Sequence, residues 1–468
     1  MSHATLHTKG IRVVDAAVDA EQAAAAMLPA DARELSLDDA MQLAVRMHQD
    51  KRLEGARTLY QRILQAAPGH PNATAMLGLA EHQLGRSAEG VRLIRQAIEQ
   101  VPGFAGFHLN LGNILVEDGQ LEPALAAYER ALELAPGVAD IRSNLGVLYR
   151  ALKRPDDARA SFEKAIELDP KHARAWNNLG LLHDSLGHLE QAMRAYVTAL
   201  ELVPENGMSI YHLGMTFYQL GAIEKATEVF RQWMEREPDN PRPRHLYAAC
   251  SGKGVPERAS DEYVEAEFDR FAASFERVLN ERLDYRAPQL CADALGAALG
   301  PATGSLQVLD VGCGTGLCGP LVRPWAARLV GVDLSGGMLE RAVTKGVYDD
   351  LVKAELTAFL RDTPGQWDAM VCADTLCYFG DLQAAMAAAA GALRPGGVFV
   401  YTVEALDDDA STVPHILPNG RYAHGRAYLD HTAAAAGLQL RAAARHRLRA
   451  EGGADVQGWV ITLARPVG

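Results

Sequence analysis

The stretch VLDVGCGTG, which runs from Val308 to Gly316, decides the fold of the C-terminal part of this 468-residue chain. Its apolar start predicts a short buried strand, and its alternating glycines predict a tight loop that leads into a helix. Glycine has no Cβ, so the backbone of such a loop can come close to a ligand. Asp310 ends the strand. The sequence therefore predicts a ligand site at the end of this strand.

Strands and helices alternate after residue 306. Strands are predicted at 306–311, 328–333, 351–355, 368–373, 397–403, 438–446 and 456–464. Helical patterns fill the first gaps, at 317–324, 336–345 and 382–393. This alternation predicts a parallel sheet wrapped by helices. The last two strands lie on either side of Gly452-Gly453 and predict an antiparallel hairpin at the edge of the sheet.

The class of ligand is set by the acid that ends the second predicted strand, Asp333. A carboxylate there can accept hydrogen bonds from both hydroxyls of a ribose. The segment Gly314 to Gly319 also matches the G-x-G-x-x-G pattern, which would indicate a nicotinamide-dependent oxidoreductase. The first glycine of that match lies four residues beyond Asp310, whereas a dinucleotide fingerprint starts at the strand itself. The oxidoreductase alternative is therefore disfavoured.

Three separated segments resemble the class I methyltransferases. VLDVGCGTG resembles their motif I, and LRPGG at 393–397 resembles their turn before the fifth strand. The closing hairpin resembles their antiparallel seventh strand. The resemblance covers about residues 260–465 and implies a Rossmann-like α/β methyltransferase domain that uses S-adenosylmethionine.

The resemblance also implies a role for each residue of the cofactor site. The methionine and ribose part of the cofactor would lie against the glycines. The cofactor's ammonium group would lie near Asp310, either in direct contact or through a water molecule. Asp333 would bind the ribose, and Met338 would pack on the adenine, although a helix-core position explains Met338 equally well. The implied set is Asp310, Gly312, Gly314, Gly316, Asp333, Met338, Glu355 and Asp374.

Two of these acids stand at the far ends of the site. Glu355 is implied near the adenine amine, although a solvated strand end explains it as well. Asp374 follows the fourth predicted strand and is expected to face the region of methyl transfer. Three further candidates for the acceptor side are Tyr378, Tyr422 and His424. His424 could act as a base, although a lone histidine in a polar loop is more often a surface residue.

Nucleic acid is disfavoured as the substrate. The chain has 46 basic and 59 acidic residues and a net charge of −13, whereas phosphate binding needs clustered cations. The segment from Ala373 to Tyr378 also lacks the Asn/Asp-Pro-Pro-aromatic and Pro-Cys motifs of nucleic-acid methyltransferases of this fold. No nucleic-acid partner is expected.

A repeat precedes this domain. Prolines recur every 34 residues, at 68, 102, 136, 170, 204 and 238, and glycines keep the same phase at 78, 112, 146, 180 and 214. A period of this size predicts a stacked helical array. Together with the small and aromatic residues of each second helix, such as Ala124 and Tyr128, the pattern resembles the tetratricopeptide repeat (TPR). Residues 37–240 are predicted to form a TPR solenoid of six repeats.

Asparagine occupies one position in three successive repeats, as Asn110, Asn144 and Asn178. An amide side chain can both donate to and accept from a peptide backbone. Such a row is similar to the asparagine ladder of the protein O-GlcNAc transferase solenoid and implies a groove that binds an extended peptide. The alternative is that asparagine is simply common at this position.

The remaining segments complete the expected organisation. Residues 1–36 form an N-terminal segment that could be helical, 241–260 a linker rich in proline and glycine, and 261–468 the methyltransferase domain. A helix over 261–300 would cover one end of that domain or act as a lid over the ligand. The six cysteines lack zinc-site spacing, so no metal is expected. No signal peptide or membrane span is apparent, so a cytoplasmic protein without membrane contact is expected.

Three functions fit these features. The first is a methyltransferase whose solenoid captures a protein or peptide substrate. The second is a methyltransferase for a small molecule, with the solenoid as a protein-docking scaffold. The third is a scaffold whose cofactor domain has lost activity, which the intact glycine loop and Asp333 disfavour.

Overall fold

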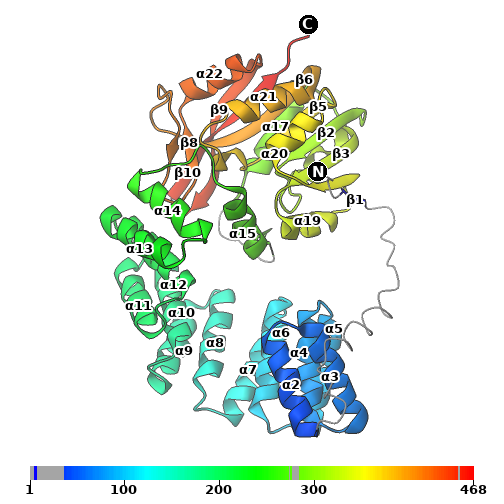
Figure 1. Cartoon of the computed structure of the whole chain (residues 1–468), viewed down its shortest axis with the longest axis vertical. Helices are drawn as coiled ribbons and strands as arrows, with labels where there is room; N and C mark the ends of the chain where they lie inside the picture. The colour runs from blue at the N-terminus through cyan, green and yellow to red at the C-terminus, as the bar shows by residue number, and fades with distance from the viewer. Residues whose placement is uncertain (1–4, 8–35, 273–274, 277–283, 452–453, 468) are drawn as a thin grey trace. The chain divides into compact units, whose positions relative to one another are not determined.

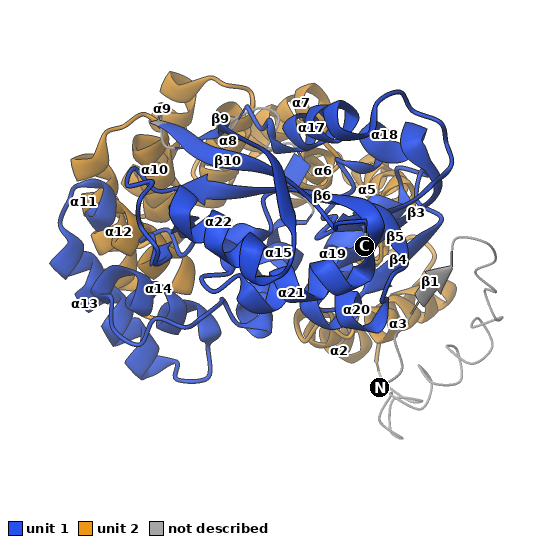
Figure 2. Ribbon diagram, turned by 90° about the horizontal axis from the view of Figure 1, so that it is seen from above, with its two compact units in different colours: residues 1–11, 217–468 blue, residues 12–216 orange. Residues whose placement is uncertain are grey.

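The computed structural model describes residues 5–7, 36–272, 275–276, 284–451 and 454–467. The chain divides into two compact units, residues 12–216 and residues 1–11 with 217–468 (Figure 2). The sequence allows a helix in the N-terminal segment 1–36, but most of this segment lies outside the described residues. Within it, Thr5–His7 forms strand β1, which pairs antiparallel with β4 (Asp350–Lys353).

Residues 37–236 form helices that follow one another with short turns (Figure 1). This confirms the predicted helical repeats. The helices are α2 (Leu37–Gln49), α3 (Leu53–Ala66), α4 (Pro71–Gln83), α5 (Ser87–Gln100), α6 (Ala105–Glu117), α7 (Leu121–Leu134), α8 (Ala139–Ala151), α9 (Pro155–Leu168), α10 (Ala173–Ser185), α11 (Leu189–Leu202), α12 (Gly207–Gln219) and α13 (Ile223–Arg236).

The glycine phase of the repeats has a packing reason. A Cβ added to Gly146 in α8 would lie 2.5 Å from a ring carbon of Phe162 in α9, closer than real Cβ atoms approach. Gly112 stands in the same relation to Tyr128. The bare position lets the aromatic ring of the second helix lie directly on the backbone of the first helix, so the paired helices pack closely.

The C-terminal unit is built on one sheet with the strand order β1-β4-β3-β2-β5-β6-β10-β9. The strands β4, β3, β2, β5 and β6 run parallel, and β10 is antiparallel to both β6 and β9. This confirms the predicted parallel sheet with a closing antiparallel hairpin. The main strands are β2 (Leu306–Val311), β3 (Ala326–Asp333), β5 (Trp367–Cys372), β6 (Leu393–Ala405), β9 (Gln439–Glu451) and β10 (Ala454–Ala464).

Helices cover both faces of this sheet because its buried strands alternate between two apolar cores. Along β2, Leu309 and Val311 belong to one core, and Val308 belongs to the other. The first core takes in residues of α20 (Leu356–Asp362), α21 (Gln383–Ala392) and α22 (Arg426–Ala435). The second takes in residues of α17 (Ala287–Leu299), α18 (Gly319–Val322) and α19 (Gly336–Val343). The carboxyl ends of the parallel strands stay uncovered by these layers.

The segment 241–260, expected as a linker, contains helix α14 (Pro241–Ser251). Its prolines lie in the first turn, where a missing N–H costs nothing, so they do not break the helix. Asn240 caps the start by accepting from the amide of Arg242 (3.0 Å). The ring of His245 in α14 stacks on Tyr263 (4.3 Å between centroids) in the next helix, α15 (Asp261–Phe271). Short strands β7 (His415–Ile416) and β8 (Tyr422–His424) add to the sheet beside β6.

Candidate functional site

A cavity opens at the carboxyl ends of β2, β3 and β5, with an empty volume of about 1130 Å³ that includes its mouth. Its wall combines the glycine loop after β2, the end of β3, the segment after β5 and residues of α15. This is the edge at which parallel sheets of this type bind ligands.

The glycine loop forms one wall through its backbone. Gly312 and Gly314 have φ angles of 68° and 54°, in the left-handed region that favours glycine. A Cβ on Gly312 would lie 2.2 Å from the hydroxyl oxygen of Thr375, so this position admits no side chain. A Cβ on Gly314 would meet nothing within 4 Å, because Gly314 faces the open cavity. The loop therefore offers bare backbone to a ligand.

Asp333, at the end of β3, lines the cavity and is tied to the glycine loop. Its Oδ2 accepts from the amide of Gly314 (2.8 Å), and its Oδ1 accepts from the amide of Ser335 (2.8 Å). Burial raises the pKa of Asp333. Each carboxylate oxygen has two lone pairs, so both can accept one further hydrogen bond. The side chain thus fits a vicinal diol such as a ribose.

Asp310 is buried and is not among the described residues that line the cavity. Its Oδ2 accepts from the hydroxyl of Tyr348 (2.7 Å), whereas its Oδ1 has no hydrogen-bond partner among the described residues. Burial raises the pKa of Asp310 to about 7. An unpaired buried oxygen next to the loop is a place where a bound cation would be stabilised.

The two residues implied near the adenine differ in their surroundings. Met338 is fully buried in α19 and is not among the described lining residues, whereas Leu334 is. Glu355 lines the cavity and caps α20, because its carboxylate accepts from the amides of Thr357 (3.0 Å) and Ala358 (2.8 Å). Met338 therefore has a packing role, and Leu334 supplies the apolar surface at that end.

Helix α15 forms another wall of the cavity. Val264 and Phe268 line it, as does Phe275 beyond the helix. Asp269 accepts from the amide of Gly337 (3.0 Å) and from the hydroxyl of Ser335, at the start of α19. The helix thus covers one end of the domain and also forms a wall of the ligand space. The two interpretations of this segment, a cover for the domain and a cover over the ligand, are therefore compatible.

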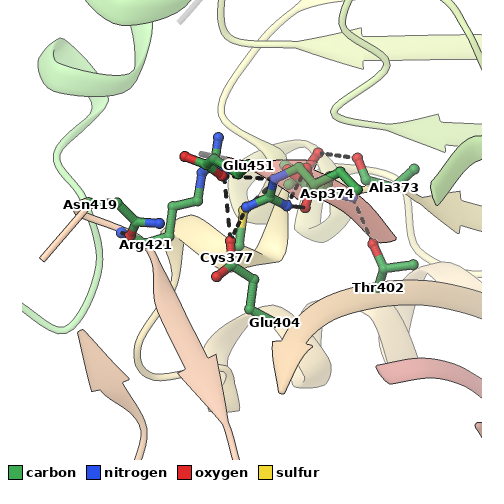
Figure 3. Close-up of polar contacts among 10 residues, drawn as sticks. Ala373, Asp374, Cys377, Thr402, Glu404, Asn419, Arg421 and Glu451 are labelled. Carbon is green, nitrogen blue, oxygen red and sulfur yellow. Dashed lines mark hydrogen bonds and ion pairs between the residues drawn. The ribbon is translucent and has the colours of Figure 1, made fainter. Parts of the chain in front are cut away.

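The end of the cavity after β5 holds a charged cluster (Figure 3). We call Asp374, Glu404, Arg421, Arg449 and Glu451 the arginine–carboxylate network. Arg449 contacts all three carboxylates, with Nη1 at 3.0 and 3.1 Å from the two oxygens of Asp374, Nε at 3.1 Å from Glu451, and Nη2 against Glu404. Arg421 Nη1 lies 3.0 Å from Glu451 and 3.5 Å from Glu404. The network joins the segment after β5 and the residue before β8 to strands β6 and β9 at one end of the cavity.

Asp374 has an unusual backbone in this network. Its φ of 56° is left-handed, which is uncommon for a residue with a Cβ. Its amide donates to the hydroxyl of Thr402 (2.8 Å), and its side chain lines the cavity. Strained residues of this kind cluster at functional sites.

The structure does not bring Tyr422 and His424 into the cavity. The Tyr422 hydroxyl donates to the carbonyl of Pro256 (2.7 Å), and His424 Nε2 lies 3.1 Å from the carbonyl of Gly380. Both side chains are buried because β8 pairs with β6, and neither is among the described lining residues. Burial lowers the pKa of His424 to about 4. The prediction that they face the acceptor is therefore wrong, whereas Tyr378 does line the cavity.

The asparagine row lies in the other unit. Asn144 donates to Asn113 of the preceding repeat (2.8 Å), and Asn113 also accepts from Tyr128 (2.8 Å). Asn110 is partly exposed, and Asn178 is 9% exposed. Asn144 thus links two successive repeats through its side chain.

Within the described ranges no three His, Cys, Asp or Glu side chains are arranged to hold a metal ion. The cysteines are unpaired thiols, and all but Cys250 are buried. None of the helices in the described residues has the length and apolar character needed to cross a membrane.

Comparison with known proteins matches each part of the chain. The family model described as Cilia and flagella-associated protein 70 C-terminal domain matches residues 19–277, more than half of the chain. A model described as Methyltransferase domain matches residues 281–443. Among solved structures, a thermophilic TPR protein of Thermus thermophilus is 23% identical, with a TM-score of 0.36, over 39% of this chain and 100% of that chain.

Two curated relatives match the C-terminal part. Methyltransferase-like protein 27 of Homo sapiens is 37% identical over 125 residues, 26% of this chain and 49% of that protein. A ubiquinone biosynthesis O-methyltransferase of Xanthomonas campestris pv. campestris is 29% identical over 159 residues, 32% of this chain and 65% of that protein. The chain thus spans about half of one relative and just under two thirds of the other.

Proposed function

This chain belongs to the family described as Cilia and flagella-associated protein 70 C-terminal domain and joins its tetratricopeptide repeats to a methyltransferase domain, and from this premise we propose that it transfers a methyl group from S-adenosylmethionine to a protein or peptide bound by the repeats. The observation that carries the proposal is the pairing of Asp333 with the Gly314 amide at the wall of an open cavity. When bound, the cofactor supplies an electrophilic methyl group on a sulfonium.

The residues that would hold the cofactor surround that pairing. The carboxylate of Asp333 would accept from the ribose hydroxyls. The bare backbone at Gly312 and Gly314 would lie against the ribose and methionine part, whereas Gly316 is not among the described lining residues and its Cα faces the ring of Tyr348. The unpaired oxygen of Asp310 would balance the ammonium group from behind the loop.

The far ends of the cofactor have their own partners. Leu334 would pack on the adenine, with Met338 as its buried support, and Glu355 would stand near the adenine amine while it caps α20. Asp374, after β5, also lines the cavity and would face the region of methyl transfer.

The chain's part in the reaction would be to align acceptor and methyl group and to exclude water. Phe268, Phe275 and Tyr378 line the cavity and supply the apolar enclosure. Aromatic faces also favour a sulfonium charge.

The proposal that the substrate is a protein or peptide depends on the repeats. Of the row Asn110, Asn144 and Asn178, the partly exposed Asn110 and Asn144 would accept from and donate to the backbone of an extended segment, whereas Asn178 is buried. A small-molecule acceptor is the second candidate, and the relative named ubiquinone biosynthesis O-methyltransferase favours it. In that case the repeats would dock the enzyme onto another protein.

One experiment separates the two candidates. The full chain is incubated with an extract of its source cells and methyl-tritiated S-adenosylmethionine, and label is counted in the protein and small-molecule fractions. Capture by the repeats predicts label in protein, reduced at least tenfold in an Asn110→Ala/Asn144→Ala variant. Label confined to the small-molecule fraction, unchanged in that variant, would support the second candidate.

A further inference from the structure

A buried tyrosine, Tyr348, lies against the glycine loop in the segment between α19 and β4, and it is 6% exposed. Its hydroxyl donates to Oδ2 of Asp310 at 2.7 Å. The next residue, Asp349, ties the segment to β3, because its amide donates to the carbonyl of Leu329 (2.9 Å) and its carboxylate accepts from the Leu329 amide (2.8 Å). The phenol is therefore held in one place beside the loop.

Three glycines leave room for the ring of Tyr348. A Cβ added to Gly319 would lie 2.6 Å from the ring carbon Cζ, and one added to Gly316 would lie 2.9 Å from Cε2, closer than real Cβ atoms approach. A Cβ on Gly331 in β3 would lie 3.1 Å from Cε1. Gly316 and Gly319 are the last two glycines of the G-x-G-x-x-G match. At these two positions the motif thus serves to seat a tyrosine ring.

The phenol divides the two oxygens of Asp310. Oδ2 accepts from Tyr348, whereas Oδ1 has no hydrogen-bond partner among the described residues, and the side chain is 1% exposed. A buried polar atom without a partner is costly unless a bound group supplies one. The contact with Tyr348 thus leaves one oxygen of Asp310 for a donor that the described residues do not provide.

The groups around Asp310 also affect its charge. Burial raises the pKa of Asp310 to about 7, the hydrogen bond from Tyr348 lowers it, and the carboxylate of Asp333 raises it. Burial raises the pKa values of the thiols that face this carboxylate and keeps them neutral near pH 7; they belong to Cys291, Cys313, Cys318 and Cys372. Burial also raises the pKa of Tyr348, which therefore stays a donor. Among these groups, Tyr348 is the one that favours the ionised form of Asp310.

We propose that Tyr348 is a positioning residue for S-adenosylmethionine, which holds the Asp310 carboxylate so that its free oxygen pairs with the cofactor's ammonium group, directly or through a water molecule. The inference rests on the proposed function and adds a residue that does not touch the cofactor. An ammonium group supplies both the missing N–H donor and a charge opposite to that of the carboxylate. Tyr348 acts only through Asp310.

Two ligands isolate the contribution of the ammonium group. S-adenosylhomocysteine carries this group, whereas 5′-methylthioadenosine keeps the adenine, ribose and thioether and lacks the amino-acid end. Both are titrated into the full chain by calorimetry. If the unaltered chain does not bind S-adenosylhomocysteine, the proposed function itself is contradicted.

The first variant is Tyr348→Phe, which keeps the ring and removes the hydroxyl. We expect it to bind S-adenosylhomocysteine about tenfold more weakly at neutral pH, because a hydrogen bond to a charged group is lost. Its affinity for methylthioadenosine should stay within about twofold of that of the unaltered chain. Equal weakening of both ligands would show that the tyrosine merely supports the loop, and no weakening of either would show that Asp310 does not need the phenol. Either result would overturn the inference.

Tyr428→Phe is the matched control. Tyr428 is also 6% exposed, and its hydroxyl donates to Oδ1 of Asp381 at 3.1 Å. Neither Tyr428 nor Asp381 is among the described residues that line the cavity. This variant should bind both ligands as the unaltered chain does.

A double-mutant cycle tests whether Tyr348 acts through Asp310. Asp310→Asn removes the charge and is expected to weaken S-adenosylhomocysteine at least as much as Tyr348→Phe does. Tyr348→Phe added to Asp310→Asn should then weaken binding by less than about twofold more. Losses that multiply would give Tyr348 a separate packing role and contradict the inference.

The pH profile is a readout that a packing role would not move. Relative to methylthioadenosine, the affinity for S-adenosylhomocysteine should fall about tenfold from pH 8 to pH 6 in the unaltered chain, as Asp310 becomes protonated. The comparison removes the contribution of Asp333, because both ligands carry the ribose. Without the phenol the pKa of Asp310 rises, so in Tyr348→Phe this fall should begin at a higher pH. Profiles of the two proteins that superimpose would overturn the inference.

Discussion

Arg449 Nη1 lies 3.0 and 3.1 Å from the two carboxylate oxygens of Asp374, and this contact ties the edge strand β9 to the segment after β5. Arg449 is 1% exposed and Asp374 is 13% exposed. A left-handed φ such as that of Asp374 costs on the order of 1–3 kcal/mol, and a buried ion pair of two contacts can hold it. The pair thus fixes the shape of the cavity where methyl transfer is proposed to take place.

Removing the cation should destabilise the C-terminal unit. Arg449→Met leaves Asp374 and the nearly buried Glu404 without their principal counter-charge, which costs about 3–5 kcal/mol. Urea unfolding followed by tryptophan fluorescence measures the change. Arg445→Met, on the same strand but one-third exposed, is the control and should cost less than about 1 kcal/mol. Equal losses in the two variants would contradict this account of the pair.

The ribose assignment is tested at Asp333. Asp333→Ala removes two carboxylate acceptors, each worth about 1.5–3 kcal/mol toward a hydroxyl, so we expect at least tenfold weaker binding of S-adenosylhomocysteine by calorimetry. Asp293→Ala, an exposed acid on α17, should bind like the unaltered chain. Unchanged affinity in Asp333→Ala would remove the ribose role.

His424 predicts a pH dependence of stability. Burial lowers the pKa of His424 from 6.5 to about 4. Between pH 4 and pH 6.5, this histidine is therefore protonated in the unfolded chain and neutral in the folded chain. The free energy of unfolding should therefore fall as the pH drops from 6.5 toward 4, by about 3 kcal/mol from this residue. His424→Gln should flatten that part of the profile, measured by urea unfolding at several pH values. A variant with the same slope as the unaltered chain would refute the assignment.

The glycine phase of the repeats predicts a packing effect. Gly146→Ala should destabilise the solenoid by about 1–3 kcal/mol, although alanine favours helix, because its Cβ would collide with Phe162. Circular dichroism during thermal unfolding measures this. Gly137→Ala, in a turn where an added Cβ meets nothing within 4 Å, should be neutral or slightly stabilising. Stabilisation by Gly146→Ala would show that the ring can move aside.

The sequence was sufficient for the parts of the molecule that local rules control. The 34-residue period predicts the helix pairs, and the alternation after residue 306 predicts the parallel sheet and its hairpin. The motif also indicates positive φ angles at Gly312 and Gly314, because few residues other than glycine adopt such angles. Asp333 could be found because the end of the second strand sits next to that loop in any sheet of this kind.

The charged end of the cavity could not be predicted in this way. Arg449 lies in the basic run 441–449, where nothing local separates it from exposed neighbours such as Arg445. Its partners are set by strand pairing between distant segments. His424 was misjudged because β8, a three-residue strand without a clear pattern, buries it beside β6. Pro241 suggested a break, whereas it occupies the first turn of α14.

The central claim is that the glycine loop and Asp333 form a site for a sulfonium nucleoside. Calorimetric titration of the full chain with S-adenosylhomocysteine, and separately with NADH, tests it most directly. The account predicts saturable one-to-one binding of S-adenosylhomocysteine and no heat from NADH. Binding of NADH alone, or of neither compound, would contradict it.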